Sequence, residues 1–209
     1  WVKQHEELFK STKAVAISFL HSYRNPENEN ALAKVLSALY PDLFVVTSSA
    51  LIPLAKEYER TLTTAANARL APIMTRYLTR LRAALSTTST RIQISDSAGG
   101  LIPLKRAAKE PIRTALSGPS AGVIGAWFAA QRFRFTKILT LDMGGTSTDI
   151  SLSDGLPEPS PTGKIGDIGL NLPMLEITTI GAGGGSLAFA DGTNLLQVGP
   201  KSAGAKPGP

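Results

Sequence analysis

The amino-acid sequence predicts an α/β fold, in which helices pack against strands. Three features of the 209 residues support this prediction: an early strand-helix-strand pattern, a long amphipathic helix, and a glycine-rich turn between two β-prone arms. Hydrophobic residues make up 43% of the chain and charged residues 18%, which provides enough apolar material for a core. The length allows one large domain or two small lobes.

The first pattern is a β-α-β unit. Residues 14–20 and 43–47 are short apolar runs, and each predicts a buried strand. Residues 27–39 place apolar side chains on one face of a helix, which Pro41 ends. Such a unit is typical of layered α/β folds.

A long amphipathic helix is predicted over residues 56–86. Pro72 lies inside it, so we expect a kink or a division into two helices. The Ser/Thr-rich residues 86–90 predict a surface linker. Basic residues such as Arg60 recur along this helix, and we interpret them as a solvated helix face.

The second half of the chain predicts one helix and several strands separated by glycine-rich turns. Residues 120–130 form a helix of small residues that permits close packing. Glycine-rich turns are predicted at 97–100 and 181–186, and the Pro/Gly-rich residues 154–173 predict a β-hairpin or an ordered functional loop. The predicted strands are 91–95, 137–141, 149–152 and 176–180.

Composition excludes several function classes. The net charge of +6 could attract an anionic partner, but only 6% of residues are aromatic, which argues against single-strand nucleic-acid binding. The absence of cysteine excludes disulfides, thiolate metal sites and cysteine nucleophiles within these 209 residues. No apolar run has membrane-spanning length and no signal peptide is recognisable, so we expect a cytoplasmic protein.

The turn between residues 142 and 149 carries the strongest chemical signal. Its glycine pair lets backbone N–H groups crowd around an anion, and its hydroxyls add donors. Its carboxylates supply hard oxygens for a divalent cation. We therefore predict a phosphate-binding hairpin, against the alternative of an ordinary glycine turn. The candidate phosphate ligands are Gly144, Gly145, Thr146 and Thr148, and the candidate catalytic carboxylates are Asp142 and Asp149.

A second glycine-rich turn follows the strand at 176–180. Such a turn suits a backbone contact to a nucleotide or substrate, which makes Gly183 and Gly184 candidate cofactor-binding residues. It is not a G-x-G-x-x-G fingerprint, because position 186 is serine. A purely structural role in packing or turning remains the alternative.

Residues 118–122 also match G-x-S-x-G, the nucleophile elbow of α/β-hydrolases. That reading needs a histidine after Ser120, whereas His5 and His21 both precede it. The sequence therefore gives Ser120 no base. His21 follows a strand, where it could touch substrate or metal, or could simply cap and pack.

Several ordered motifs together resemble the hydantoinase A/5-oxoprolinase family of the actin, Hsp70 and sugar-kinase superfamily. The resemblance covers nearly the whole chain. Its motifs lie at 21–26, at 57–60 with Thr64 and Asn67, at 117–119, at 142–149, at 179–186, and at 198–200 with 202–204 and 207–209.

The resemblance implies a fold of ribonuclease-H-like lobes, each a mixed sheet flanked by helices. Residues 1–54 would end the first lobe, and residues 55–209 would form a hydantoinase A-type domain with the crossing helix and the start of the second lobe. The chain begins at Trp1 and stops at Pro209 in a Gly/Pro-rich run, so we expect a segment of a longer chain. The first-lobe phosphate hairpin is expected upstream.

The resemblance also implies ATP-dependent, Mg²⁺-assisted hydrolysis of a cyclic amide, activated by phosphorylation. Backbone N–H groups of Gly144, Gly145 and Thr146 would bind phosphate. Asp142 would hold the Mg²⁺ shell or orient water, and Asp149 would be a second carboxylate or a turn cap. The implied partners are a small cyclic amide, the rest of the parent chain, and a hydantoinase B-type subunit or domain.

Two alternatives remain open: an ATP-dependent acetone- or acetophenone-carboxylase-type subunit, and a non-catalytic actin-like module. The 209 residues alone are expected to be inactive. One departure from the family pattern bears on activity. The family commonly has Gln-Ser-Asn-Gly-Gly before the crossing helix, whereas residues 96–100 here read Asp-Ser-Ala-Gly-Gly, with Ala98 in place of the amide.

Overall fold

The computed structural model describes residues 2–85, 91–204 and 206. The predicted linker at 86–90 and the motif at 207–209 lie outside the described residues. The elements of the first half are η1 (Val2–His5), α1 (Glu6–Ser11), β1 (Ala14–Ile17), α2 (Glu27–Leu39), β2 (Phe44–Thr47), α3 (Ser48–Leu51) and α4 (Glu57–Ala84). Those of the second half are β3 (Gln93–Ser95), β4 (Leu101–Pro103), α5 (Leu104–Lys109), η2 (Pro111–Thr114), α6 (Ser117–Gln131), β5 (Lys137–Met143), β6 (Thr148–Asp154), β7 (Gly163–Ile165), β8 (Ile168–Leu170), β9 (Thr178–Ile180), β10 (Ser186–Ala190) and β11 (Leu196–Ser202).

The predicted β-α-β unit is confirmed. β1 and β2 pair in parallel, with Ala14 opposite Phe44 and Ile17 opposite Thr47, and α2 connects them. Leu36 of α2 packs with Ile17, Phe9 and Leu43 in a small core, because the apolar face of the helix needs a partner away from water.

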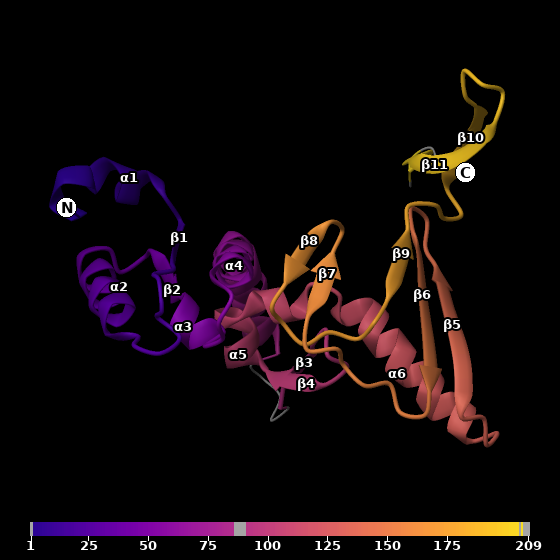
Figure 1. Cartoon of the computed structure of the whole chain (residues 1–209), viewed down its shortest axis with the longest axis horizontal. Coiled ribbons are helices and arrows are strands. Elements are labelled where there is room, and N and C mark those ends of the chain that lie inside the picture. The colour runs from indigo at the N-terminus through magenta and orange to yellow at the C-terminus, as the bar shows by residue number, and fades with distance from the viewer. Residues whose placement is uncertain (1, 86–90, 205, 207–209) are drawn as a thin grey trace.

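α4 is one continuous helix, so the expected division into two helices is wrong. Pro72 lacks the N–H that would bond to the preceding turn. Tertiary packing offsets that loss, because α4 contacts β1 and β2 on one side and α5, η2 and β8 elsewhere. Figure 1 shows α4 near the middle of the molecule, between the N-terminal unit and the elements that lead to the C-terminal hairpins.

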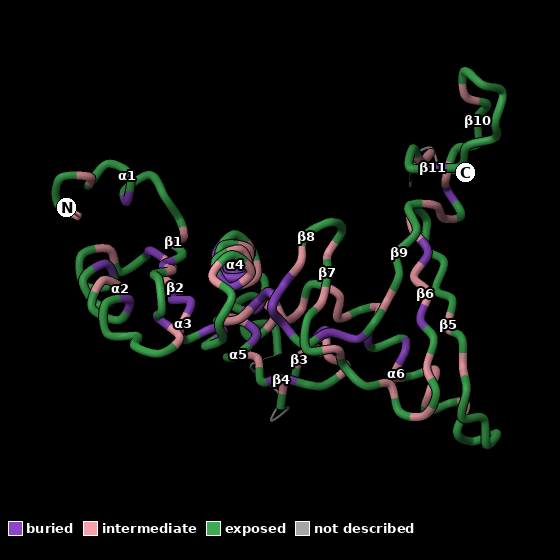
Figure 2. Tube along the Cα trace, viewed as in Figure 1, coloured by how far each residue is buried: buried purple, intermediate pink, exposed green. Residues whose placement is uncertain are grey.

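The strands of the described chain are divided among five small sheets rather than gathered in one mixed sheet. β1 and β2 are the parallel pair, and the other pairs are antiparallel. The Pro/Gly-rich region contains the hairpin β7–β8, which was one of its two predicted forms. Buried residues gather around α4, whereas the β5–β6 hairpin is largely exposed (Figure 2).

The hairpin β10–β11 was not predicted. Its turn is held by Asp191, whose carboxylate accepts hydrogen bonds from Thr193, Leu195 and Gln197. The hydroxyl of Thr193 is the largest of the influences that lower the pKa of Asp191 to about 2. Sequence periodicity could not reveal this turn, since its strands carry no strict alternation.

A buried polar network joins the β-α-β unit to α4. Arg60, which we interpreted as solvated, is fully buried. Its guanidinium donates to Ser48 Oγ (3.0 Å), to the carbonyls of Leu54 (3.0 Å) and Phe19 (2.8 Å), and to the carboxylate of Glu57. The interpretation was wrong because side-chain type alone does not show that these acceptors surround one helix position.

Glu29 is the anionic centre of the same network and is also fully buried. It accepts hydrogen bonds from the backbone N–H of Phe19 (2.8 Å), from Ser48 Oγ (2.7 Å), and from both the N–H and the hydroxyl of Ser49 (2.9 and 2.7 Å). Burial alone would raise the pKa of Glu29, but these four donors together lower it.

Glu29→Gln is expected to destabilise the β-α-β unit by about 2–4 kcal/mol, because a buried anion that accepts four hydrogen bonds is replaced by a neutral amide. Because the folded pKa of Glu29 is lowered, its contribution is complete above the ordinary value near 4.5 and is lost as the pH falls through the folded value. Hydrogen exchange of α2 and β2 peptides in the full-length protein measures both effects.

The matched control is Glu27→Gln, an exposed glutamate in the first turn of the same helix. Equal protection of the α2 and β2 amides from hydrogen exchange in the two variants would contradict the stabilising role of Glu29.

Candidate functional site

The candidate phosphate hairpin forms as predicted. β5 and β6 pair over their whole length, with Met143 opposite Thr148, and residues 144–147 make the turn. The N–H of Gly144 donates to the carbonyl of Ser147 (2.9 Å) and closes the turn, so it is not available to a ligand. In the part of the chain that the structure describes, the N–H groups of Gly145 and Thr146 have no partner, and both residues are exposed.

The second glycine-rich turn packs directly on this hairpin. The N–H of Gly184 donates to the carbonyl of Gly144 (2.9 Å), and that of Gly185 donates to the carbonyl of Gly145 (2.8 Å). The hydroxyl of Thr148 donates to the carbonyl of Ala182 (2.7 Å). The two predicted turns therefore form one backbone layer, a contact that the sequence alone did not reveal.

Gly183 has no room for a side chain. A Cβ there would overlap the carbonyl oxygen of Gly144 and approach the backbone nitrogen of Ser147 to 2.8 Å. The N–H of Gly183 donates to Ser186 Oγ (2.8 Å). Because the N–H groups of Gly183 and Gly184 are both used within the protein, the structure favours the packing alternative for these two residues over direct contact with a nucleotide.

The two candidate carboxylates face each other across the hairpin. Asp142 and Asp149 are register partners in β5 and β6. Asp149 accepts a hydrogen bond from the hydroxyl of Thr179 in β9 (2.6 Å), and no described backbone N–H donates to it, so it is held by a neighbouring strand rather than capping the turn. Asp142 is exposed, and its carboxylate has no partner among the described residues.

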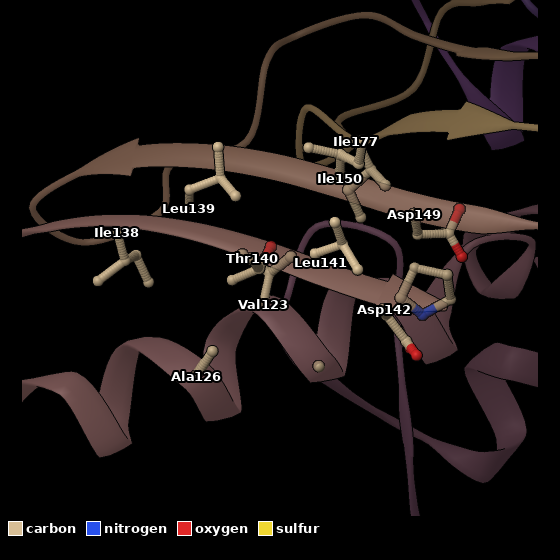
Figure 3. A pocket seen from close by; sticks show the side chains of 12 residues that line it. Val123, Ala126, Ile138, Leu139, Thr140, Leu141, Asp142, Asp149, Ile150 and Ile177 are labelled. Carbon is tan, nitrogen blue, oxygen red and sulfur yellow. The ribbon is translucent and has the colours of Figure 1, made fainter. Parts of the chain in front are cut away.

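The carboxylates lie at one end of a cavity of about 480 Å³ between α6 and the hairpin. Figure 3 shows Asp142 and Asp149 at this end and Ile138 and Leu139 at the other. The predicted close packing of α6 is not found at Gly122 or Gly125, where an added Cβ would meet nothing within 4 Å. The small residues of α6 instead leave this space open. The α6 residues that line the cavity are Pro119, Gly122, Val123 and Ala126.

The donor set fits a magnesium ion that arrives with phosphate. Mg²⁺ keeps several waters and is usually held by one or two carboxylates together with phosphate oxygens. Asp142 offers an unpaired carboxylate beside the free N–H groups of the turn. Within the described ranges, no group of three or more His, Asp or Glu side chains could hold a metal alone.

The nucleophile-elbow alternative is not supported. Ser120 is fully buried, and its hydroxyl donates to the carbonyl of Ser97 (3.0 Å), so it ties α6 to the turn after β3. His21 belongs to the N-terminal unit, where its backbone N–H donates to Glu57 Oε1 (3.0 Å). Ala98 lies in the Gly-rich turn, and its N–H donates to Asp96 Oδ1 (3.2 Å).

Comparison with known families gives one clear match. The family model described as Hydantoinase/oxoprolinase matches residues 60–209. Caprolactamase subunit alpha of Pseudomonas jessenii is 39% identical over 203 residues, which are 96% of this chain and 29% of that protein. The 5-oxoprolinase of Saccharomyces cerevisiae is 36% identical over 201 residues, covering 94% of this chain and 15% of that protein.

Two solved structures share the fold. The ATP-dependent caprolactamase from Pseudomonas jessenii has a TM-score of 0.81 at 38% identity and covers 100% of this chain and 30% of its own. Nucleotide-free acetone carboxylase has a TM-score of 0.80 at 32% identity, and the match covers 94% of this chain and 29% of the acetone carboxylase chain. The predicted α/β fold is confirmed, and these two neighbours are consistent with an actin-like ATPase fold. The chain spans less than a third of each of these proteins.

No helix in the described ranges is both long enough and apolar enough to cross a membrane.

Gly183→Ala is expected to force the two glycine-rich turns apart, because the new Cβ meets backbone rather than a flexible side chain. The expected local destabilisation is about 2–4 kcal/mol, with faster amide exchange in the β5–β6 turn. Gly192→Ala is the matched control, since a Cβ there meets nothing within 4 Å. Unchanged exchange in the Gly183 variant would refute the packing described here.

Proposed function

The chain belongs to the hydantoinase/oxoprolinase family, and we propose that it is part of an ATP-dependent enzyme that hydrolyses a cyclic amide. One observation carries this proposal: the free N–H groups of Gly145 and Thr146 lie at the hairpin tip that also bears Asp142 and Asp149. Caprolactamase and 5-oxoprolinase among the relatives support the substrate class.

The chemistry explains why phosphate ligands and carboxylates belong in one site. A cyclic amide resists water because its carbonyl is resonance-stabilised. Transfer of the γ-phosphoryl group of ATP to the amide oxygen forms one O–P bond as the bond to ADP breaks. Water then adds to the activated carbon, the C–N bond breaks as the ring nitrogen takes a proton, and a second water releases phosphate from the acyl phosphate.

Each side chain then has a defined task. The N–H groups of Gly145 and Thr146 would bind the phosphate oxygens on which negative charge develops. Asp142 would hold the magnesium shell, and Mg²⁺ when bound would neutralise phosphate charge. Asp149, fixed by Thr179, would keep the second carboxylate at a constant position.

The proposal includes the organisation of the parent protein. We propose that residues 1–54 end a first lobe and that residues 55–209 belong to the hydantoinase A-type domain. The family match that begins at residue 60 supports this division. A relative named as a subunit alpha supports assembly with another chain, for which a hydantoinase B-type subunit or domain is the candidate. The cytoplasmic location also belongs to the proposal, and cell fractionation tests it.

A carboxylase-type subunit is the second candidate, favoured by the similarity to acetone carboxylase. In that case ADP release would depend on bicarbonate and a ketone instead of a cyclic amide. A non-catalytic actin-like module would give no nucleotide-induced shift in thermal stability.

Gly145→Ala separates phosphate binding from folding. A Cβ at Gly145 meets no protein atom within 4 Å, so the variant is expected to fold normally. The same Cβ would obstruct an anion approaching the N–H groups of the turn, so the dissociation constant for ATP is expected to rise about tenfold or more. Calorimetric titration of the full-length protein with ATP measures this change. Gly192→Ala is again the control, and equal ATP affinity in both variants would count against phosphate binding at this turn.

Asp142→Asn is expected to lower cyclic-amide-stimulated ADP release about 10²- to 10³-fold, because it removes the unpaired carboxylate without changing its shape. The assay offers hydantoin, 5-oxoproline and ε-caprolactam in turn. Asp154→Asn is the control, since Asp154 lies at the far end of the same hairpin in an exposed ion pair with Lys137. Turnover at the control level in the Asp142 variant would exclude the proposed role.

A further inference from the structure

A second cavity, of about 510 Å³, lies between the N-terminal end of α4 and the segment from residue 160 to residue 178. Its apolar lining includes Leu116, Leu170, Met174 and Ile177. None of the residues that the sequence singled out for chemistry lines it. Figure 1 shows the surrounding elements, with β7 and β8 between α4 and β9.

Asn171 is the unusual residue of this cavity. It is only 7% exposed, and its backbone N–H donates to the hydroxyl of Thr63 on α4 (3.0 Å). That hydroxyl in turn donates to the carbonyl of Glu59 (2.7 Å), which fixes the position of Asn171.

The carboxamide of Asn171 has no hydrogen-bond partner anywhere in the described chain, although the residue lines the cavity. It is not among the fully enclosed unpaired groups, so its polar atoms keep some access to solvent. A carboxamide that is accessible but has no partner within the chain is available to pair with a bound molecule.

The chemistry of a carboxamide defines a matching ligand. The side chain of asparagine presents a donor and an acceptor along one edge. In a small ring the amide is held cis, with its N–H and C=O also along one edge, whereas an acyclic secondary amide is trans and points them in opposite directions. One carboxamide can therefore form two reciprocal hydrogen bonds with a cyclic amide but only one with a linear amide.

The surroundings suit such a ligand. Lys56, Glu59, Lys164 and Glu176 also line the cavity, and their formal charges cancel, so a neutral ring is not opposed by net charge. Ile177 borders both this cavity and the one that contains Asp142 and Asp149. Thr178 lines this cavity and pairs with Ile150 of the hairpin.

We propose that this cavity binds the cyclic amide and that Asn171 recognises it through a reciprocal pair of hydrogen bonds. The inference rests on the proposed function, because it names the place where the substrate of that reaction is held. It also assigns selectivity for cyclic over linear amides to one side chain.

The test compares a cyclic amide with its N-methyl derivative, which cannot donate to Asn171 Oδ1. The probe is whichever of hydantoin, 5-oxoproline and ε-caprolactam most stimulates ADP release by the full-length protein with its partner subunit. Binding is measured by calorimetric titration without ATP. The wild-type protein is expected to prefer the unmethylated ring about tenfold or more, and Asn171→Leu is expected to reduce this preference to about threefold or less.

If Asn171 had only a structural role, Asn171→Leu would weaken the binding of both ligands equally and leave the ratio of their dissociation constants unchanged. That result would overturn the inference. Asn28→Leu, an exposed asparagine on α2, is the matched control. An unaltered dissociation constant for ATP shows that the Asn171→Leu variant is folded. If that variant does not fold, Asn171→Ser is compared with the wild-type protein in the same way. If the ratio persists while amide-stimulated ADP release is intact, only the inference fails. If no probe stimulates ADP release, the proposed function fails, and the inference with it.

Discussion

The buried polar face of α4 is the constraint on which the rest of the structure depends. Three of its side chains satisfy backbone groups in other segments of the chain. Arg60 binds the carbonyls of Phe19 and Leu54 after the two parallel strands. Thr63 accepts from the N–H of Asn171, and Asn67 both donates to the carbonyl of Lys109 and accepts from the N–H of Ile112. Because a buried backbone group left unpaired is costly, these contacts fix the segments around one helix.

The glycine-rich turns apply a related constraint at the hairpin. Gly183 approaches the backbone of Gly144 so closely that any side chain would separate them. The result is a turn whose outer N–H groups, those of Gly145 and Thr146, are held in place by protein on one side and open on the other. An anion site needs this combination, since flexible donors would lose entropy when they order around phosphate.

The parts of the fold that could be predicted from sequence are those set by local pattern. The bounds of α2 agree with the prediction because periodic apolar residues and Pro41 define them locally. The continuity of α4 through Pro72 could not be predicted, because it depends on packing partners far away in sequence. At the candidate site the residue types pointed to the hairpin, but the loss of Gly144 as a donor arises from its bond to Ser147. Asn171 carried no sequence signal, since only the folded chain shows that its amide is unpaired.

Two hydroxyls connect these constraints to the proposed chemistry. Thr63 fixes Asn171, and Thr179 fixes Asp149. Thr179 lies in β9, which follows the segment that lines the second cavity, so a shift of β9 would move Asp149 and the cavity wall together. Transfer of a phosphoryl group to a substrate oxygen tolerates little misplacement, and a 1 Å error can cost about 100-fold in rate. Because Ile177 borders both cavities directly before β9, this strand keeps the wall of the second cavity and the candidate phosphate hairpin in register.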